Sequence, residues 1–209
     1  MNNTALPTYI AARYDELKDK IQERLSEFSS VPQSEYFYEL CFCLCTPQSK
    51  AENANKVIEI LKKKDFLHRP FNPAGILRQP EHYIRFHNTK AARLLQAREY
   101  YDMVINILER DISPIEKRSW LVDNIKGMGM KEASHFLRNI GYRGLAILDR
   151  HILKHLVHCN LYKEVPKVTS AKQYLEVEAI FLNFAASVSI PIDELDLLFW
   201  SYETGIILK

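Results

Sequence analysis

Apolar side chains recur every three or four residues along most of this chain, which is the spacing of one face of an α-helix. The clearest stripe lies near the N-terminus, opposite a face rich in charged residues, and it comprises Ile10, Tyr14, Leu17, Ile21, Leu25 and Phe28. From Tyr36 to Cys45 every residue except Glu39 is apolar or aromatic. We therefore expect an amphipathic first helix, followed by a helix that is buried on nearly all sides.

Residues that start and stop helices divide the rest of the chain. Ser49 and Glu52 have the spacing of a capping box, which predicts a helix from there to about Leu61. Residues 65–87 predict a surface loop or a broken helix, and one long helix is expected from 88 or 89 to about 110. Later helices are expected at about 114–125, 130–139, 148–158, 170–187 and 191–203. No paired runs of alternating polarity are present, so the predicted fold class is all-α.

Length and composition narrow the possible partners. The 209 residues, 47% of them hydrophobic, suffice for one large domain or two small lobes. A net charge of +2 is compatible with nucleic acid but excludes the charge density of a purely electrostatic DNA binder. No stretch reaches the roughly 18 consecutive apolar residues of a membrane span, and the first residues lack a secretory pattern. We therefore expect a soluble, cytoplasmic protein.

The chain has four cysteines, which are compatible with the reducing environment of the cytoplasm. Cys41, Cys43 and Cys45 alternate along one predicted helix, which wraps them around it instead of directing them at one metal. We expect them to act as small buried hydrophobes. His151, His155, His158 and Cys159 lie close in sequence and could suggest zinc, but no recognisable ligand pattern is complete. A surface helix explains them, and no metal is expected.

The most distinctive local pattern is a glycine-rich turn between two predicted helices, Gly127-Met128-Gly129-Met130-Lys131. Glycine lacks a Cβ, so it permits a tight turn and a close approach to a phosphate. Helical spacing of the flanking apolar residues predicts a helix-hairpin-helix, whose outward backbone N–H groups bind DNA phosphate without reading sequence. The alternative is an ordinary corner between two helices that carries a solvated lysine.

Lys131 and a later aspartate could supply chemistry. Lys131 falls in the first turn of its helix, where the positive end of the dipole disfavours an ammonium and makes a neutral, nucleophilic amine more accessible. Asp149 follows eighteen residues later, directly before another predicted helix. It could be only the N-cap of that helix, although capping and catalysis are compatible roles.

In these residues the chain resembles the helix-hairpin-helix superfamily of DNA glycosylases, in which a Gly-x-Gly-x-Lys hairpin precedes an essential Asp. Lys131 and Asp149 match those two positions. Among the branches, the chain is similar to the short archaeal and bacterial type of 8-oxoguanine DNA glycosylase with lyase activity. The likeness spans nearly the whole chain and is carried by residues 85–91, 127–141, 146–151 and 197–209.

The resemblance implies a two-lobed fold with the active-site cleft between the lobes. One lobe would comprise about 40–145, with the hairpin at 121–140, and the other 1–39 plus 146–209. It also implies double-stranded DNA containing 8-oxoguanine as partner, and a base flipped into a pocket. Lys131 would attack C1′ and form a Schiff base that permits β-elimination, while Asp149 would stabilise the positive charge developing on the sugar.

Recognition of the oxidised base rests on the resemblance as well. The chain's last residue in that family is a lysine that inserts toward the base, and Lys209 occupies this position. Its terminal carboxylate is a plausible acceptor for the N7–H that distinguishes 8-oxoguanine from guanine. Trp200 is the candidate stacking platform, with Phe86 a weaker candidate for the opposite face; core packing is the alternative for both. Gln48 matches an amide residue that fills the hole left by the flipped nucleotide.

Two other functions remain possible at this level. One is a non-catalytic helix-hairpin-helix module that only binds DNA through Gly127 and Gly129, and the other is a glycosylase for another damaged base, such as an oxidised pyrimidine or a mismatched base. The four-cysteine iron–sulfur motif of some relatives is absent, because only Cys159 lies in the C-terminal half. We expect a monomer without a cofactor, associated with the nucleoid.

Overall fold

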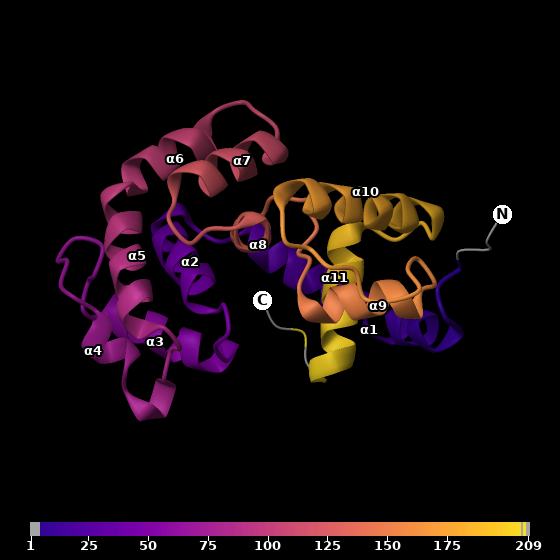
Figure 1. Ribbon diagram of the computed structural model, residues 1–209, viewed down its shortest axis with the longest axis horizontal. Coiled ribbons are helices and arrows are strands. Elements are labelled where there is room, and N and C mark those ends of the chain that lie inside the picture. The colour runs from indigo at the N-terminus through magenta and orange to yellow at the C-terminus, as the bar shows by residue number, and fades with distance from the viewer. Residues whose placement is uncertain (1–4, 206, 208–209) are drawn as a thin grey trace. The chain divides into compact units, whose positions relative to one another are not determined.

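The structure, a computed structural model, describes residues 5–205 and 207, and every regular element in that part of the chain is a helix (Figure 1). The all-α fold class is therefore confirmed. The elements are α1 (Thr8–Ser29), α2 (Gln33–Cys45), α3 (Ala51–Lys63), α4 (Ala74–Leu77), the 3₁₀ turn η1 (Pro80–His82), α5 (His87–Glu99), α6 (Tyr101–Glu109), α7 (Pro114–Asn124), α8 (Met130–Asn139), α9 (Arg150–His158), α10 (Ala171–Ser187) and α11 (Ile192–Thr204).

Contacts divide the chain into two compact units. The terminal unit comprises residues 1–30 and 137–209, and the central unit comprises 31–136. The family resemblance implied boundaries near residues 39 and 145, whereas the contacts place them after residues 30 and 136, the second of them inside α8. The terminal unit is thus built from both ends of the chain.

The core of the central unit is formed around α2. All residues from Phe37 to Cys45 are buried, including Glu39 and the three cysteines, which are free thiols. Burial raises the pKa of Cys45 to about 12, so this thiol stays neutral at pH 7. Helix α5 lies along α2 (Figure 1). The expected interior helix and the expected role of its cysteines are both confirmed.

The single long helix expected from 88 to 110 is wrong. The structure has α5 and α6 instead, which meet at Tyr100, a residue with φ −93° and ψ 3°. The buried positions continue across the break at helical spacing, from Leu94 and Ala97 to Tyr101 and Val104. Periodicity therefore could not reveal the interruption.

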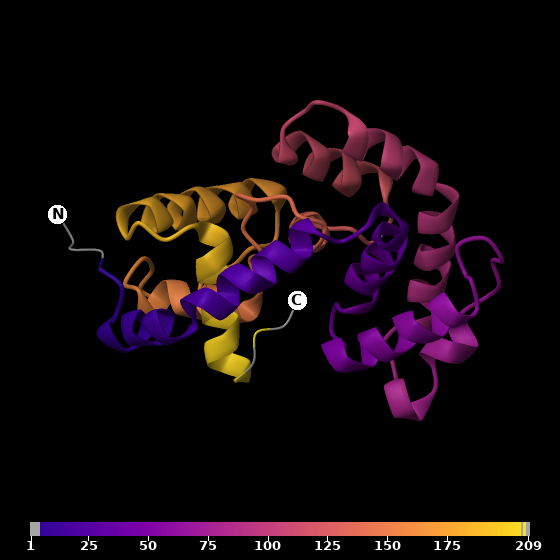
Figure 2. The same cartoon turned by 180° about the vertical axis from the view of Figure 1, so that it is seen from behind.

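The core of the terminal unit is formed around α11. Helix α1 buries the predicted apolar stripe on it, since Ile10, Leu17, Ile21, Leu25 and Phe28 are all at most 9% exposed. Helix α9 covers another side of α11, so that α9 lies in front of it in Figure 1 and α1 in Figure 2. A buried ion pair from Arg138 Nη1 to Asp196 Oδ2, 2.9 Å long, ties α8 to α11.

No single helix among the described residues is both long and apolar enough to cross a membrane. Helices α10 and α11 meet the criteria of length and composition only as a pair, with a bend of 98° between them.

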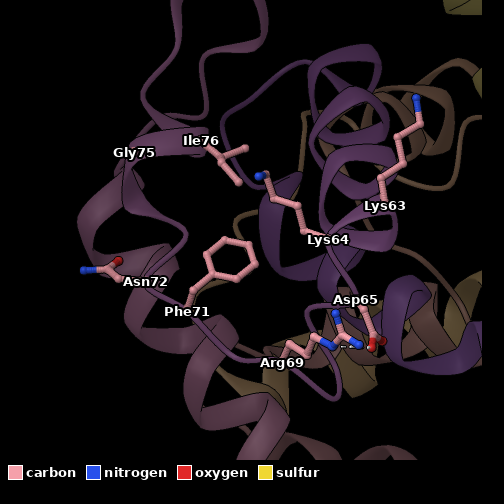
Figure 3. A pocket seen from close by; sticks show the side chains of 8 residues that line it. All are labelled: Lys63, Lys64, Asp65, Arg69, Phe71, Asn72, Gly75 and Ile76. Carbon is pink, nitrogen blue, oxygen red and sulfur yellow. Dashed lines mark ion pairs between the residues drawn. The ribbon is translucent and has the colours of Figure 1, made fainter.

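A basic surface hollow of about 540 Å³ lies in the central unit, at the C-terminal end of α3 and before α4 (Figure 3). Lys63, Lys64 and Arg69 contribute positive charge there, and Phe71 contributes an aromatic ring. Arg69 Nε lies 3.8 Å from Asp65 Oδ2. None of the lining residues is a predicted site residue, so the hollow plays no part in the site described below.

The histidine-rich helix α9 is only partly a surface helix. His155 is fully buried and stacks on Phe199 of α11, with ring centroids 4.6 Å apart. Neither ring nitrogen has a hydrogen-bond partner in the described part of the chain. The expectation of a surface helix is wrong for His155 and for Cys159, which is also buried, because the contact with α11 requires this face to be covered. Among the described residues no cluster of three or more acidic, His or Cys side chains could hold a metal.

Burial, and to a smaller extent the nearby His158, lower the pKa of His155 from its ordinary 6.5 to about 4, against the opposing effect of Glu203. The unfolded chain therefore binds a proton at His155 more readily than the folded chain between these pH values. The free energy of unfolding should fall as the pH drops from 6.5 to about 4, by up to about 3 kcal/mol from this group alone.

We expect this contribution to vanish in His155→Leu, which has a similar volume and no titratable group. Urea unfolding of both proteins at several pH values between about 7 and 4.5 measures it. The difference in unfolding free energy between wild type and variant should shift in favour of the variant on acidification. A difference that stays constant over this range would contradict the assignment.

Candidate active site

The hairpin turn between α7 and α8 depends on Gly127. Its φ is +90°, a conformation that L side chains rarely adopt, and an added Cβ would lie 2.4 Å from Cδ of Arg93. Gly129 is not in the left-handed region, but a Cβ there would lie 2.9 Å from Oε2 of Glu132. The buried side chain of Met128 anchors the turn between the two glycines. A Cβ at either position would thus displace a flexible side chain, and only at Gly127 does the backbone conformation itself favour glycine.

Lys131 lies in the first turn of α8, as predicted. Its side chain is 26% exposed, and Nζ lies 3.8 Å from Oε1 of Glu132. The other oxygen of Glu132 accepts a hydrogen bond from the Gly129 N–H at 3.2 Å. The sequence interpretation gave Glu132 no role, although its place three residues after Gly129 is that of the acid in a capping box. Glu132 thus joins the start of α8 to the candidate nucleophile.

Helix α5 supports the hairpin through polar side chains that the sequence interpretation also missed. Nε2 of Gln96 donates to the carbonyl of Asn124 at 3.1 Å, and Oε1 of Gln96 accepts the Lys126 N–H at 3.2 Å. Arg93, one turn earlier, packs against Gly127. These two residues fix the backbone on which Lys131 depends.

Gln48 is exposed on the loop between α2 and α3, with a left-handed φ of 55°. The predicted capping box of α3 is wrong: Lys50 is the N-cap, and no side chain caps the helix. The Ser49 hydroxyl instead accepts the Arg85 N–H at 3.0 Å and a hydrogen bond from Nζ of Lys90 at 3.2 Å. Long-range partners therefore outcompete the local cap.

Phe86 opens α5 with an exposed ring and a strained backbone. Its φ is +60° and its side chain is 51% exposed, so core packing is excluded for this residue. The guanidinium of Arg85 lies 5.0 Å from the ring centroid. A bulky residue costs about 1 kcal/mol or more in the left-handed region, and such strain is common at functional sites. Two predicted site residues, Gln48 and Phe86, share this conformation.

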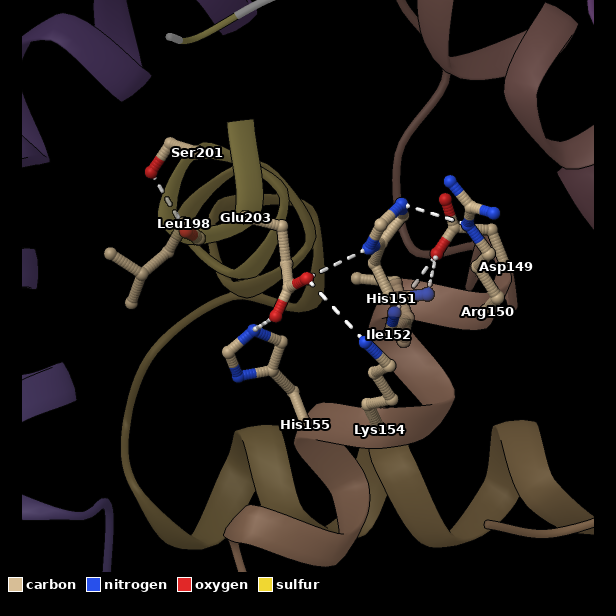
Figure 4. A network of polar contacts seen from close by, with 9 residues as sticks. All are labelled: Asp149, Arg150, His151, Ile152, Lys154, His155, Leu198, Ser201 and Glu203. Carbon is tan, nitrogen blue, oxygen red and sulfur yellow. Dashed lines mark hydrogen bonds and ion pairs between the residues drawn. The ribbon is translucent and has the colours of Figure 1, made fainter. Parts of the chain in front are cut away.

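Asp149 is the N-cap of α9, as the local pattern allowed. Its Oδ1 accepts the N–H groups of His151 at 2.8 Å and Ile152 at 2.9 Å, and the side chain is half-buried (Figure 4). These bonds hold the carboxylate in one orientation and leave Oδ2 available for another group. Capping therefore preorganises the charge that catalysis would use.

The first turns of α9 contact the last turn of α11 through Glu203 (Figure 4). Oε2 of Glu203 lies 3.1 Å from Nδ1 of His151 and 3.7 Å from Nζ of Lys154. Oε1 lies 3.6 Å from Nε2 of His155. Burial alone would raise the pKa of Glu203. The hydrogen bond from His151 and the charge of Lys154 outweigh this effect, so the pKa lies below its ordinary value. The carboxylate is thus held ionised.

The candidate base-recognition residues of the C-terminal segment are only partly described. Trp200 is half-buried in α11, so neither stacking nor packing is excluded. Lys209 lies outside the described residues. Lys131 and the hairpin glycines belong to the central unit, together with Gln48 and Phe86. Asp149 and Trp200 belong to the terminal unit.

Comparison with known proteins shows the family to which the chain belongs. The profile of the Ogg-HhH family, 8-oxoguanine DNA glycosylase, matches residues 21–190. The 8-oxoguanine DNA glycosylase/AP lyase of Fusobacterium nucleatum subsp. nucleatum is 42% identical over 206 residues, 94% of each chain. The protein of the same name from Methanocaldococcus jannaschii is 39% identical over 198 residues, 93% of this chain and 94% of the relative.

Solved structures of such proteins are similar as well. The Methanocaldococcus jannaschii 8-oxoguanine glycosylase/lyase in complex with 15mer DNA containing 8-oxoguanine matches with a TM-score of 0.84 and 35% identity, covering 97% of this chain and 100% of that one. The 8-oxoguanine DNA glycosylase of Thermotoga maritima matches with a TM-score of 0.85 and 33% identity, covering 97% of each chain. The chain therefore belongs to the 8-oxoguanine DNA glycosylase family with the helix-hairpin-helix fold.

Proposed function

We propose that this protein excises 8-oxoguanine from double-stranded DNA and cleaves the strand at the resulting abasic site, with Lys131 as the nucleophile and Asp149 as the supporting carboxylate. The observation that carries the proposal is a partly exposed lysine in the first turn of a helix-hairpin-helix, in a chain 42% identical to an 8-oxoguanine DNA glycosylase/AP lyase. The family supports the substrate and the reaction, and the geometry of each unit supports the proposed residue roles.

The reaction begins at the N-glycosidic bond. The neutral amine of Lys131 attacks C1′ as the bond to the base breaks, and the base leaves with the electron pair of that bond and takes up a proton. Positive charge develops on the sugar, and the carboxylate of Asp149, held by its two N–H donors, stabilises it. Ring opening then gives an iminium between Lys131 and C1′, a Schiff base.

The iminium makes strand cleavage possible. It acidifies the C2′ proton, so that loss of this proton expels the 3′ phosphate by β-elimination. Hydrolysis of the Schiff base releases Lys131. The hairpin would hold the DNA backbone during these steps, because the first N–H groups of α8 have no partners within the helix and suit a phosphate.

Recognition of the lesion is proposed to come from the C-terminal segment and α5. Lys209 would contact the oxidised base and help to distinguish it from guanine, which lacks the N7–H. Trp200 and the exposed ring of Phe86 would stack on the flipped base, and Gln48 would fill its place in the duplex. We further propose that the protein acts as a monomer in the cytoplasm, close to the nucleoid.

Borohydride trapping tests the assignment of Lys131. Wild-type protein incubated with an 8-oxoguanine duplex and borohydride should form a covalent adduct, because borohydride reduces the iminium to a stable amine. Lys131→Gln should form none, whereas the control Lys163→Gln, at an exposed lysine, should behave as wild type. Asp149→Asn should slow base release about 100-fold or more while still capping α9, because Asn is an equally good N-cap.

Two outcomes would contradict this proposal. A folded wild-type protein that binds the duplex but forms no adduct would favour the non-catalytic binding module. An adduct on a duplex with an oxidised pyrimidine or a mismatch, and none on the 8-oxoguanine duplex, would change the lesion but keep the chemistry.

Deletion of Lys209 tests the proposed reader of the base. The truncated protein should bind duplex DNA as wild type does, and its preference for 8-oxoguanine over guanine should fall about tenfold or more, the loss expected when a polar contact that distinguishes the two bases is removed. Binding titrations together with single-turnover excision from both duplexes measure the two quantities. Equal loss of binding and of discrimination would refute the role of the C-terminal lysine.

A further inference from the structure

The loop that carries Gln48 is hydrogen-bonded to a buried ammonium group. Lys90, in the first turn of α5, is only 1% exposed. Its Nζ donates to the carbonyl of Cys45 at 2.7 Å, to the carbonyl of Pro47 at 2.6 Å and to the hydroxyl of Ser49 at 3.2 Å. All three donors of the ammonium are thus used, and all three acceptors flank Gln48.

The backbone of this loop needs such a donor. Helix α2 ends at Cys45, and the last carbonyls of a helix have no partner within it. A cation at this end also suits the negative end of the helix dipole. Gln48 itself is held at a left-handed φ of 55°, a conformation that non-glycine residues adopt only when their surroundings enforce it. The ammonium supplies bonds on both sides of this strained residue.

Keeping Lys90 charged at this place has a cost. Burial is the main cause that lowers the pKa of Lys90 to about 8; the charges of Arg93 and Lys131 contribute to this shift, and Cys45 and Glu132 oppose it. An apolar side chain would fill the same space without the free-energy cost of burying a charge. The ammonium therefore contributes more to this loop than the filling of space.

The same face of α5 reaches the hairpin. Lys90, Arg93 and Gln96 follow one another at a spacing of three residues, which places them on one side of the helix. Arg93 packs against Gly127, and Gln96 brackets the backbone at Asn124 and Lys126. One helix face therefore holds both the Gln48 loop and the hairpin of Lys131, all within the central unit.

We propose that Lys90 is a positioning residue, whose ammonium fixes the loop 46–49 so that Gln48 is presented to the gap left by a flipped nucleotide. This inference rests on the proposed function, in which Gln48 fills that gap. Lys90 does not touch the reacting atoms. Its loss should therefore impair extraction of a base from a duplex more than the chemistry at Lys131.

A comparison of two substrates tests this. Excision of 8-oxoguanine from a duplex leaves a gap to be filled, whereas strand cleavage at a preformed abasic site in a single-stranded oligonucleotide does not. In single-turnover assays Lys90→Met should slow the first reaction about tenfold or more and the second less than about threefold. Gln48→Ala should give the same pattern. The double variant should be no more than about twofold slower than the slower single variant, because both changes remove one function.

The chain offers a matched control in Lys117. This lysine is also buried, and its Nζ donates to three backbone carbonyls, those of Ile107, Leu108 and Arg110. Lys117→Met therefore removes the same kind of loop clamp at a place without predicted site residues. It should lower the melting temperature as Lys90→Met does, yet leave the ratio of the two reaction rates unchanged.

The outcomes separate this inference from the proposed function. If wild type excises the lesion but Lys90→Met slows both reactions equally, or its effect multiplies with that of Gln48→Ala, Lys90 is only structural and the inference fails alone. If wild-type protein does not act on either substrate, the proposed function fails. Should Lys90→Met not fold, Ser49→Ala removes one acceptor and keeps the ammonium, and a smaller change of the rate ratio in the same direction is expected; an unchanged ratio would overturn the inference.

Discussion

The ends of α-helices leave backbone groups without partners, and this constraint shapes the candidate site more than any other. The first N–H groups and the last carbonyls of a helix must find side chains, water or ligand. Lys131 stands in a first turn, Asp149 and Phe86 are N-caps, and Gln48 follows the end of α2. Residues at such positions are oriented by the bonds that satisfy the helix end, which is how a helical protein can direct a few polar groups accurately.

Some helix ends obtain their hydrogen bonds from neighbouring residues, and others obtain them from residues far away in the sequence. Asp149 binds N–H groups two and three residues ahead, so α9 contains its own cap. The loop after α2 and the backbone at the end of α7 instead receive hydrogen bonds from α5, through Lys90 and Gln96. A local cap orients one side chain relative to one helix, whereas a distant donor also fixes two segments relative to each other. The second arrangement suits the placement of a loop and a nucleophile on one DNA strand.

The same distinction explains how far the sequence could predict the fold and the site. Periodicity identified the stripe of α1 and the buried α2, and glycine spacing identified the hairpin, because these are local patterns. The roles of the lysine and the aspartate are predictions that rest on their spacing together with the family resemblance. The capping box at Ser49 failed because Lys90, 41 residues away, competes for the same hydroxyl. One sign of this was present, since Lys90 shares a helix face with Leu94 and Ala97, where a charged residue is unexpected.

Glu203 links the helix that Asp149 caps to the end of α11, where the C-terminal segment begins. Asp149 and His151 stand at the start of α9, and Glu203 in the last turn of α11 contacts three side chains of that helix. Helix α11 then ends at Gly205, whose φ of +78° turns the chain out of the helix. The residues proposed to recognise the base therefore follow in sequence after a helix end that contacts α9, the helix capped by Asp149. A substitution of Glu203 or of its partners on α9 would therefore disturb both Asp149 and the end of α11. Such substitutions should lower the rate of excision and the discrimination between the bases together. Removal of Lys209 itself should not couple the two effects.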